Sequence, residues 1–126
     1  MGVNSFEKII LLIPAYNPDG KLVELVEALG REFPRIVVVD DGSVEGRGAL
    51  ESVRGRVAAM PAHARNRGKG AALRTGFSWV LEHAPDARGV VTVDADGQPR
   101  PEDVRRVAEE TLRHAGALVL GGRDFS

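Results

Sequence analysis

Residues 89–103, which read GVVTVDADGQPRPED, contain in one stretch the pattern that decides the fold. The β-branched run from Gly89 to Val93 predicts a short buried strand. It leads directly into the acidic turn Asp94 to Gln98, and Pro101-Glu102-Asp103 then places proline and acids where they suit the first turn of a helix. A buried strand, a polar turn and a helix in this order indicate one unit of an α/β fold.

The same order recurs along the whole chain. Strands are predicted, from runs of aliphatic residues, at Lys8 to Ile13, Ile36 to Val39, Arg56 to Met60 and Ala117 to Leu120. Helices are predicted, from apolar residues at three- and four-residue spacing, at Lys21 to Phe33, Val44 to Val53, Ala71 to His83 and from Pro101 onward. We therefore expect a single domain over residues 1–126, with an open, mostly parallel sheet in a three-layer α/β/α Rossmann-like arrangement.

The composition of the chain excludes several classes of ligand and of structural site. The 126 residues have a formal net charge of −1, so the chain lacks the basic field that holds nucleic acid non-specifically. They include no cysteine, which excludes disulfides and thiolate metal sites within this sequence. The longest apolar run, Ile9 to Ile13, is too short to cross a bilayer, and Met1 to Ile13 lacks the pattern of a secretory leader. A cytoplasmic location is the expectation.

Polar clusters follow four of the predicted strands. They are Pro14 to Asn17, Asp40 to Ser43, Asp94 to Asp96 and Gly121 to Arg123. In open parallel sheets the carboxyl ends of the strands meet at one edge, where ligands bind. The four clusters are therefore expected to converge on one site.

Asp94 and Asp96 are candidate metal ligands. In an extended chain, residues two apart point to the same side, so these like charges would repel unless a cation lies between them. Mg²⁺ or Mn²⁺ suits such a pair, because these ions take one or two carboxylates and fill their other positions with phosphate oxygens and water. Gln98 could add a neutral oxygen. The alternative is that both acids only form a turn.

Asp40, Asp41 and Tyr16 are candidates for contact with a nucleoside. One of the two acids can face the crevice and accept hydrogen bonds from a base or a ribose while the other supports its loop, and Ser43 is expected to cap the next helix. The ring of Tyr16, the single tyrosine, could stack on a base. The alternative for Tyr16 is a half-buried ring under the loop.

The segment Asn66 to Gly70 is glycine-rich but is not a Walker phosphate loop, which needs Ser or Thr directly after its lysine. Lys69, with Arg65, Arg67 and Arg74 nearby, could still offer positive charge to a diphosphate, although solvated side chains are the alternative. The histidines lie on separate segments without ligand spacing and are interpreted as structural: His63, His83 and His114.

Five motifs in register resemble the inverting family 2 glycosyltransferases of the GT-A fold, most of all the dolichol- and polyprenyl-phosphate mannosyl- and glucosyltransferases. The motifs are Ile13 to Asn17, Val38 to Ser43, Asn66 to Ala72, Asp94 to Gln98 and Gly121 to Arg123. They occur in order and cover nearly the whole chain.

The resemblance implies a nucleotide-sugar donor, UDP- or GDP-linked, and a divalent metal. By position it implies that the nucleoside pocket is lined by Pro14, Tyr16, Val39 and Asp41, with the Ala95 backbone beside the nucleotide. Asp94, Asp96 and Gln98 would hold the metal, the two acids being the catalytic candidates, and Arg123 would contact a phosphate. The implied reaction inverts the sugar's anomeric carbon, with a polyprenyl phosphate as the expected acceptor.

Some residues depart from the family pattern. They are Pro18, Gly122 and the loop Glu45 to Gly48. Because the sequence ends at Ser126, where relatives continue, we expect a donor half without its acceptor half, and a membrane-associated parent is compatible with this expectation. The competing hypothesis is a non-catalytic nucleotide-sugar-binding module. A phospho-receiver and a sugar nucleotidyltransferase fit less well, because neither pattern matches Pro14 to Tyr16.

Overall fold

The sheet is parallel, and its central strand is the first in the chain. The computed structural model describes residues 6–97 and 99–114. Strand β1 (Ile9–Ala15) lies between β2 (Ile36–Asp40) and β3 (Gly89–Thr92), in the order β2-β1-β3. Ala15 pairs with Asp40, so β1 and β2 end level with each other. The loops that follow these two strands therefore start side by side.

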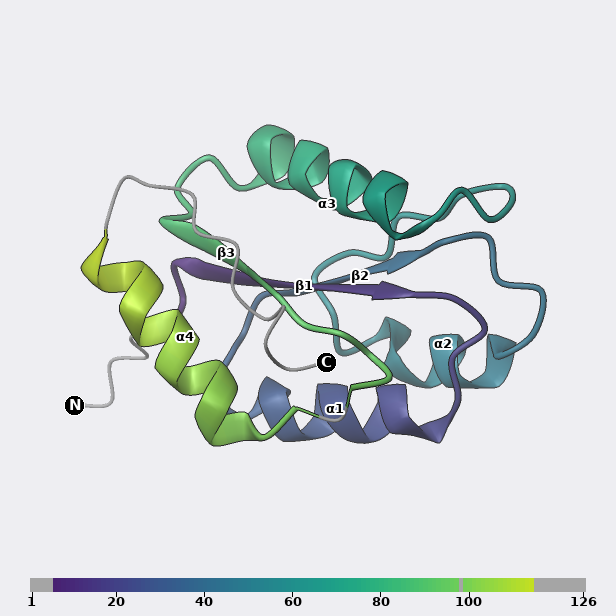
Figure 1. Ribbon diagram of the computed structural model, residues 1–126, viewed down its shortest axis with the longest axis horizontal. Helices are drawn as coiled ribbons and strands as arrows, with labels where there is room; N and C mark the ends of the chain where they lie inside the picture. Colours follow the sequence, from purple (N-terminus) through teal and green to yellow (C-terminus); the bar gives the residue numbers. More distant parts are fainter. Residues whose placement is uncertain (1–5, 98, 115–126) are drawn as a thin grey trace.

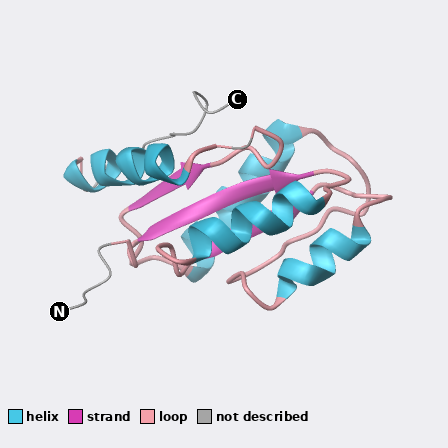
Figure 2. Ribbon diagram, turned by 90° about the horizontal axis from the view of Figure 1, so that it is seen from below, coloured by secondary structure: helices cyan, strands magenta, loops and turns pink. Residues whose placement is uncertain are grey.

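Four helices cover the two faces of the sheet. They are α1 (Gly20–Gly30), α2 (Arg47–Arg54), α3 (Lys69–His83) and α4 (Pro101–Arg113). Helix α3 covers one face, and α1, α2 and α4 cover the other (Figure 1). Figure 2 shows the sheet between these helices in a view turned by 90°. The predicted three-layer α/β/α arrangement is confirmed.

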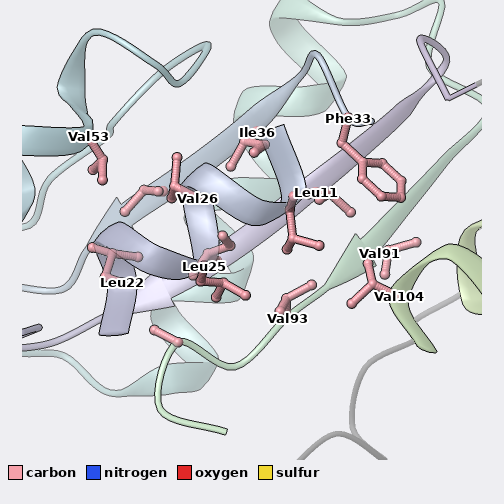
Figure 3. Close-up of a cluster of buried hydrophobic side chains, with 14 of the residues drawn as sticks. Leu11, Leu22, Leu25, Val26, Phe33, Ile36, Val53, Val91, Val93 and Val104 are labelled. Carbon is pink, nitrogen blue, oxygen red and sulfur yellow. The ribbon is translucent and has the colours of Figure 1, made fainter. Parts of the chain in front are cut away.

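Successive side chains of each strand point to opposite faces of the sheet, and this alternation divides the core into two apolar clusters. Leu11 and Ile13 of β1 point toward α1, α2 and α4 and pack with residues such as Val26 and Val104 (Figure 3). Ile10 and Leu12 belong to the cluster under α3. Because both faces of the sheet are buried, the strands are continuous aliphatic runs rather than alternating polar and apolar ones.

Helix α2 begins later than the sequence indicates. The prediction placed its start at Val44, but the N-cap is Gly46, which has a left-handed φ of 80°. A Cβ at Gly46 would lie 2.3 Å from the carbonyl oxygen of Pro18, so only glycine fits there. The expectation that Ser43 caps this helix is wrong, because the Ser43 hydroxyl accepts the backbone N–H of Asn17 instead, at 2.9 Å.

The predicted strand at Arg56 to Met60 is not a regular strand. This segment and the residues that follow it pair with β2 through two isolated parallel bridges, Val37 with Ala59 and Asp40 with Ala62. Between the bridges lies Pro61, which has no N–H to donate, so the ladder is interrupted there. The strand predicted at Ala117 to Leu120 lies outside the described residues.

An ion cluster joins the three strands at the end of the sheet away from the polar loops. The guanidinium of Arg35 makes two hydrogen bonds to the Asp86 carboxylate, at 2.9 and 3.0 Å, and Lys8 reaches the same carboxylate at 3.2 Å. Arg35 directly precedes β2, Lys8 directly precedes β1, and Asp86 lies three positions before the start of β3. The hydrogen bonds from Arg35, which have the largest effect, and from Lys8 hold the pKa of Asp86 well below its ordinary value.

Helix α3 lies unusually close to the sheet at Gly76. A Cβ there would lie 2.3 Å from Cδ1 of Leu12, a side chain that is fully buried in β1. The absence of a side chain at position 76 therefore sets how closely α3 approaches the central strand.

We expect Gly76→Ala to lower the free energy of unfolding by about 1 to 2 kcal/mol, because overpacking against Leu12 outweighs the better helix propensity of alanine. Urea unfolding measures this change. Gly70→Ala in the same helix is the control, because a Cβ at Gly70 meets only Arg74 Nη1 at 3.6 Å. Equal effects of the two substitutions would contradict the close approach.

A second prediction concerns the Asp86 cluster. A lowered pKa means that the stabilisation is complete above the ordinary value of 3.8 and is lost as the pH falls through the folded-state value. Asp86→Asn should therefore destabilise the protein at neutral pH, and the difference from wild type should shrink in acid and in high salt. Urea unfolding at about pH 7 and about pH 3 measures this. Glu24→Gln, an exposed α1 change without an ion pair among residues 6–97 and 99–114, should show no such trend.

Candidate functional site

A cavity of about 320 Å³ opens where the carboxyl ends of the strands meet. Its walls come from four segments that are distant in sequence. The end of β1 contributes Pro14 and Ala15, with Tyr16 directly after it, and the segment after β3 contributes Asp94 and Asp96. The segment after β2 and the start of α3 contribute Asp41, Asn66, Gly68, Lys69 and Ala72. The predicted convergence of polar clusters thus holds for the three clusters within the described residues.

The predicted site residues divide into three groups. Pro14, Tyr16, Asp41, Asp94 and Asp96 all line this cavity. The side chains of Val39 and Ala95 are buried in the two apolar clusters instead. Gln98 and Arg123 lie outside the described residues.

Asp41 is the most densely hydrogen-bonded side chain of the site, and it is 4% exposed. Its Oδ1 accepts hydrogen bonds from Nδ1 of His63 at 2.7 Å and from the N–H of Arg67 at 2.9 Å. Its Oδ2 accepts from Nδ2 of Asn66 at 3.0 Å and from the N–H of Gly68 at 2.9 Å. Each oxygen thus accepts two hydrogen bonds, which uses the full capacity of a carboxylate.

These contacts keep Asp41 ionised. Burial raises its pKa, but the hydrogen bonds from His63 and from the N–H groups of Arg67 and Gly68 outweigh burial, so the pKa lies below its ordinary value. An ionised carboxylate only accepts hydrogen bonds, so Nδ1 of His63 bears the proton that it donates.

His63 was interpreted from sequence as structural, and its contacts could not have been found there. Its ring lies between Asp41 and α3, and Nε2 contacts Oγ1 of Thr75 at 2.7 Å. The side chain is only 6% exposed. Asp41 and Thr75 lie 22 and 12 positions away in the sequence, so no local spacing indicates either contact.

The loop after β2 is held in one shape by close backbone packing. Gly42 has a φ of 72°, and a Cβ there would lie 2.0 Å from the carbonyl carbon of Arg65. Asp40 supports the same turn, since its Oδ1 accepts the N–H of Ser43 at 2.9 Å. Asp40 thus holds the turn, as expected for one acid of the pair. Asp41 lines the cavity, as expected for the other, but its carboxylate also holds residues 66–68.

Asn17 joins the loop after β1 to the loop after β2. Its Oδ1 accepts the N–H groups of Val44 and Glu45, at 2.9 and 3.0 Å. Asn17 is also the one described non-glycine residue with positive φ, at 49°. This turn presents Tyr16 at the cavity with 47% of its surface exposed, so its ring is not covered by the loop.

The acidic pair lines the same cavity from the segment after β3, and among residues 6–97 and 99–114 its turn is closed by local hydrogen bonds. Oδ1 of Asp94 accepts the N–H of Asp96 at 3.0 Å, which is a local turn contact. Asp96 is exposed and Asp94 is partly buried. Within residues 6–97 and 99–114 no group of three or more acidic, histidine or cysteine side chains is placed to hold a metal. Two carboxylates on one wall fit a hard cation that keeps water and phosphate oxygens as its other ligands.

Positive charge near the cavity comes from Lys69. Lys69 is the first residue of α3, and its side chain lines the cavity that Asp94 and Asp96 also line. Arg67 and Arg74 line a separate hollow of about 360 Å³ between α3 and Pro61. Of Lys69, Arg65, Arg67 and Arg74, Lys69 is therefore the one that lines this cavity.

Comparison with known proteins identifies relatives. Polyprenol monophosphomannose synthase of Mycolicibacterium smegmatis is 34% identical over 128 residues, covering 96% of this chain and 47% of that protein. Undecaprenyl-phosphate mannosyltransferase of Micrococcus luteus is 35% identical over 123 residues, covering 92% and 48%. UDP-N-acetylglucosamine–dolichyl-phosphate N-acetylglucosaminyltransferase of Methanococcus voltae is 30% identical over 132 residues, covering 91% and 51%.

The chain spans about half the length of these curated relatives. No solved structure gives a significant match. The family model described as glycosyl transferase family 2 matches residues 10–126, which include every described strand except the first residue of β1, all four helices and the whole cavity. The chain therefore belongs to glycosyl transferase family 2.

Proposed function

We propose that this chain is the donor-binding half of a metal-dependent, inverting glycosyltransferase that uses a UDP- or GDP-linked sugar. The observation that supports this proposal best is the cavity at the carboxyl ends of the strands. It has an exposed aromatic ring, two carboxylates and a lysine on its walls, from Tyr16, Asp94, Asp96 and Lys69. A nucleoside diphosphate offers a matching base, a metal-binding diphosphate and negative charge.

The nucleoside would lie on the side formed by Pro14, Tyr16 and the loop at Asp41. Tyr16 offers an exposed ring on which a base can stack. Asp41 already accepts four hydrogen bonds, so its contribution is to fix this wall, and a contact to base or ribose requires it to exchange one of those partners. Val39 and Ala95 would contribute through their backbone, since their side chains are in the core.

Asp94 and Asp96 would hold Mg²⁺ or Mn²⁺ on the opposite wall, with Gln98 as the third oxygen ligand. When bound, such an ion neutralises the charge that develops on the departing nucleoside diphosphate. Lys69 adds fixed positive charge on the cavity wall. The acidic pair therefore serves catalysis by orienting the diphosphate and lowering the cost of its departure.

A polyprenyl phosphate is the proposed acceptor. The names of the relatives from M. smegmatis, M. luteus and M. voltae refer to polyprenol, undecaprenyl-phosphate and dolichyl-phosphate, respectively. A phosphate monoester is already ionised near pH 7, so it can attack the anomeric carbon without a general base. Arg123 would contact a phosphate of the donor or the acceptor. No helix within residues 6–97 and 99–114 is long and apolar enough to cross a membrane.

Calorimetric titration of this 126-residue chain with UDP and with GDP, each with and without Mn²⁺, tests the donor site directly. We expect one of the two nucleotides to bind in the micromolar to millimolar range, and at least tenfold more weakly without Mn²⁺. Absence of metal-dependent binding to both nucleotides would contradict the proposal. Sugar transfer or donor hydrolysis that Asp96→Asn abolishes would exclude the alternative of a non-catalytic nucleotide-sugar-binding module.

Asp94→Asn and Asp96→Asn should each remove most of the Mn²⁺-dependent gain in nucleotide affinity, because an amide is a weaker ligand for a hard cation than a carboxylate. Glu102→Gln, an exposed change on α4 near the same edge of the sheet, is the control and should leave affinity unchanged. Thermal unfolding of all three variants tests the alternative hypothesis that Asp94 and Asp96 only form a structural turn. If either aspartate variant unfolds the domain while Glu102→Gln does not, the acids are structural.

A further inference from the structure

We propose that His63 is a positioning residue for nucleotide binding: it holds the Asp41 carboxylate and, through it, the wall formed by residues 66–68 in the shape that accepts the nucleotide. The inference rests on the proposed function of the cavity. It assigns to this function a buried side chain that does not itself line the cavity.

His63 bridges two elements that shape the site. On one side its Nδ1 donates to Asp41 at 2.7 Å, at the end of β2. On the other side Nε2 contacts Oγ1 of Thr75 at 2.7 Å, in the second turn of α3. The first residue of this same helix, Lys69, lines the cavity. The imidazole therefore fixes the start of α3 relative to the end of the central sheet.

Both ring nitrogens have a partner of suitable chemistry. Asp41 only accepts, so the Nδ1–H of His63 points toward it, and the Thr75 hydroxyl can donate to the unprotonated Nε2. No buried side-chain nitrogen or oxygen of the described residues lacks a hydrogen-bond partner. Removal of the imidazole would leave Oδ1 of Asp41 with the N–H of Arg67 as its remaining partner.

Removal of the imidazole would affect the cavity through the backbone of residues 67 and 68. The N–H groups of Arg67 and Gly68 bind the two oxygens of Asp41, and Asn66 donates to the same carboxylate. Asn66 and Gly68 line the cavity beside Asp41. If Asp41 rotates after losing His63, all three contacts change together, and the nucleotide-facing wall changes with them.

The order Asp41, His63, Thr75 has the connectivity of a hydrolase triad, but Thr75 is not placed as a nucleophile. It lies within α3, where the neighbouring backbone N–H groups are committed to helical hydrogen bonds and none is free to stabilise an oxyanion. The structure therefore favours a role in positioning.

Two substitutions at position 63 separate the two contacts. In His63→Asn the amide nitrogen can take the place of Nδ1 and still donate to Asp41, whereas in His63→Gln the longer amide can take the place of Nε2 and keep only Thr75. We expect His63→Gln to weaken nucleotide binding in the presence of Mn²⁺ about tenfold and His63→Asn to weaken it less than threefold. Thr75→Val should weaken binding two- to threefold, with recovery in Thr75→Ser.

Hydrogen exchange without nucleotide gives an independent measurement. His63→Gln should accelerate exchange at the amides of Arg67 and Gly68 at least tenfold, with little change in α1 and α4, and His63→Asn should protect these amides nearly as well as wild type. Equal loss of affinity and equal exchange in the two variants, or acceleration spread evenly over the chain, would overturn the inference. Failure of wild type to bind any nucleotide would overturn the proposed function instead, and the exchange data would still decide the role of His63.

Discussion

The site depends on one buried carboxylate whose hydrogen-bonding capacity is completely used. A charged group that is 4% exposed at the end of a central strand must be fully hydrogen-bonded, or its desolvation would destabilise the fold. Asp41 meets that requirement with donors from His63, Asn66 and the backbone of residues 67 and 68. The same contacts bring the start of α3 to the strand ends, so the need to satisfy a buried charge also builds one wall of the cavity.

Most of the fold follows from local signals in the sequence. Aliphatic runs at β1, β2 and β3 are long enough to be buried on both faces, and that pattern alone predicts a parallel sheet between helices. The two errors have different causes. Helix α2 starts at Arg47 because Gly46 lies against Pro18, a residue 28 positions earlier that gives no local signal. The segment at Ala59 fails to form a continuous strand because Pro61, which directly follows the predicted strand, cannot donate a hydrogen bond.

The candidate site divides in the same way. Pro14, Tyr16, Asp41 and the acidic pair could be assigned to one edge because parallel strands bring their carboxyl ends together, and all of them line the cavity. The residues that support them could not be identified. His63 is one histidine among three with no ligand spacing, and its role depends on partners that only the folded chain brings near. Sequence position thus indicated which side chains meet but not which ones hold them there.

The two walls of the cavity differ in how much order exists before a ligand arrives. On the Asp41 side, the carboxylate contacts and the close approach of Gly42 to Arg65 already fix the backbone. On the other side, the described residues of the acidic turn make two local hydrogen bonds, from the N–H of Asp96 to Oδ1 of Asp94 and from the N–H of Gly97 to the carbonyl oxygen of Asp94. Binding at the first wall therefore costs little conformational entropy, whereas the described part of the acidic turn is held only by contacts within the turn and has more freedom to adjust to a ligand. Most of the entropic penalty of binding, and much of the variation in affinity among ligands of different charge, should arise at the acidic wall.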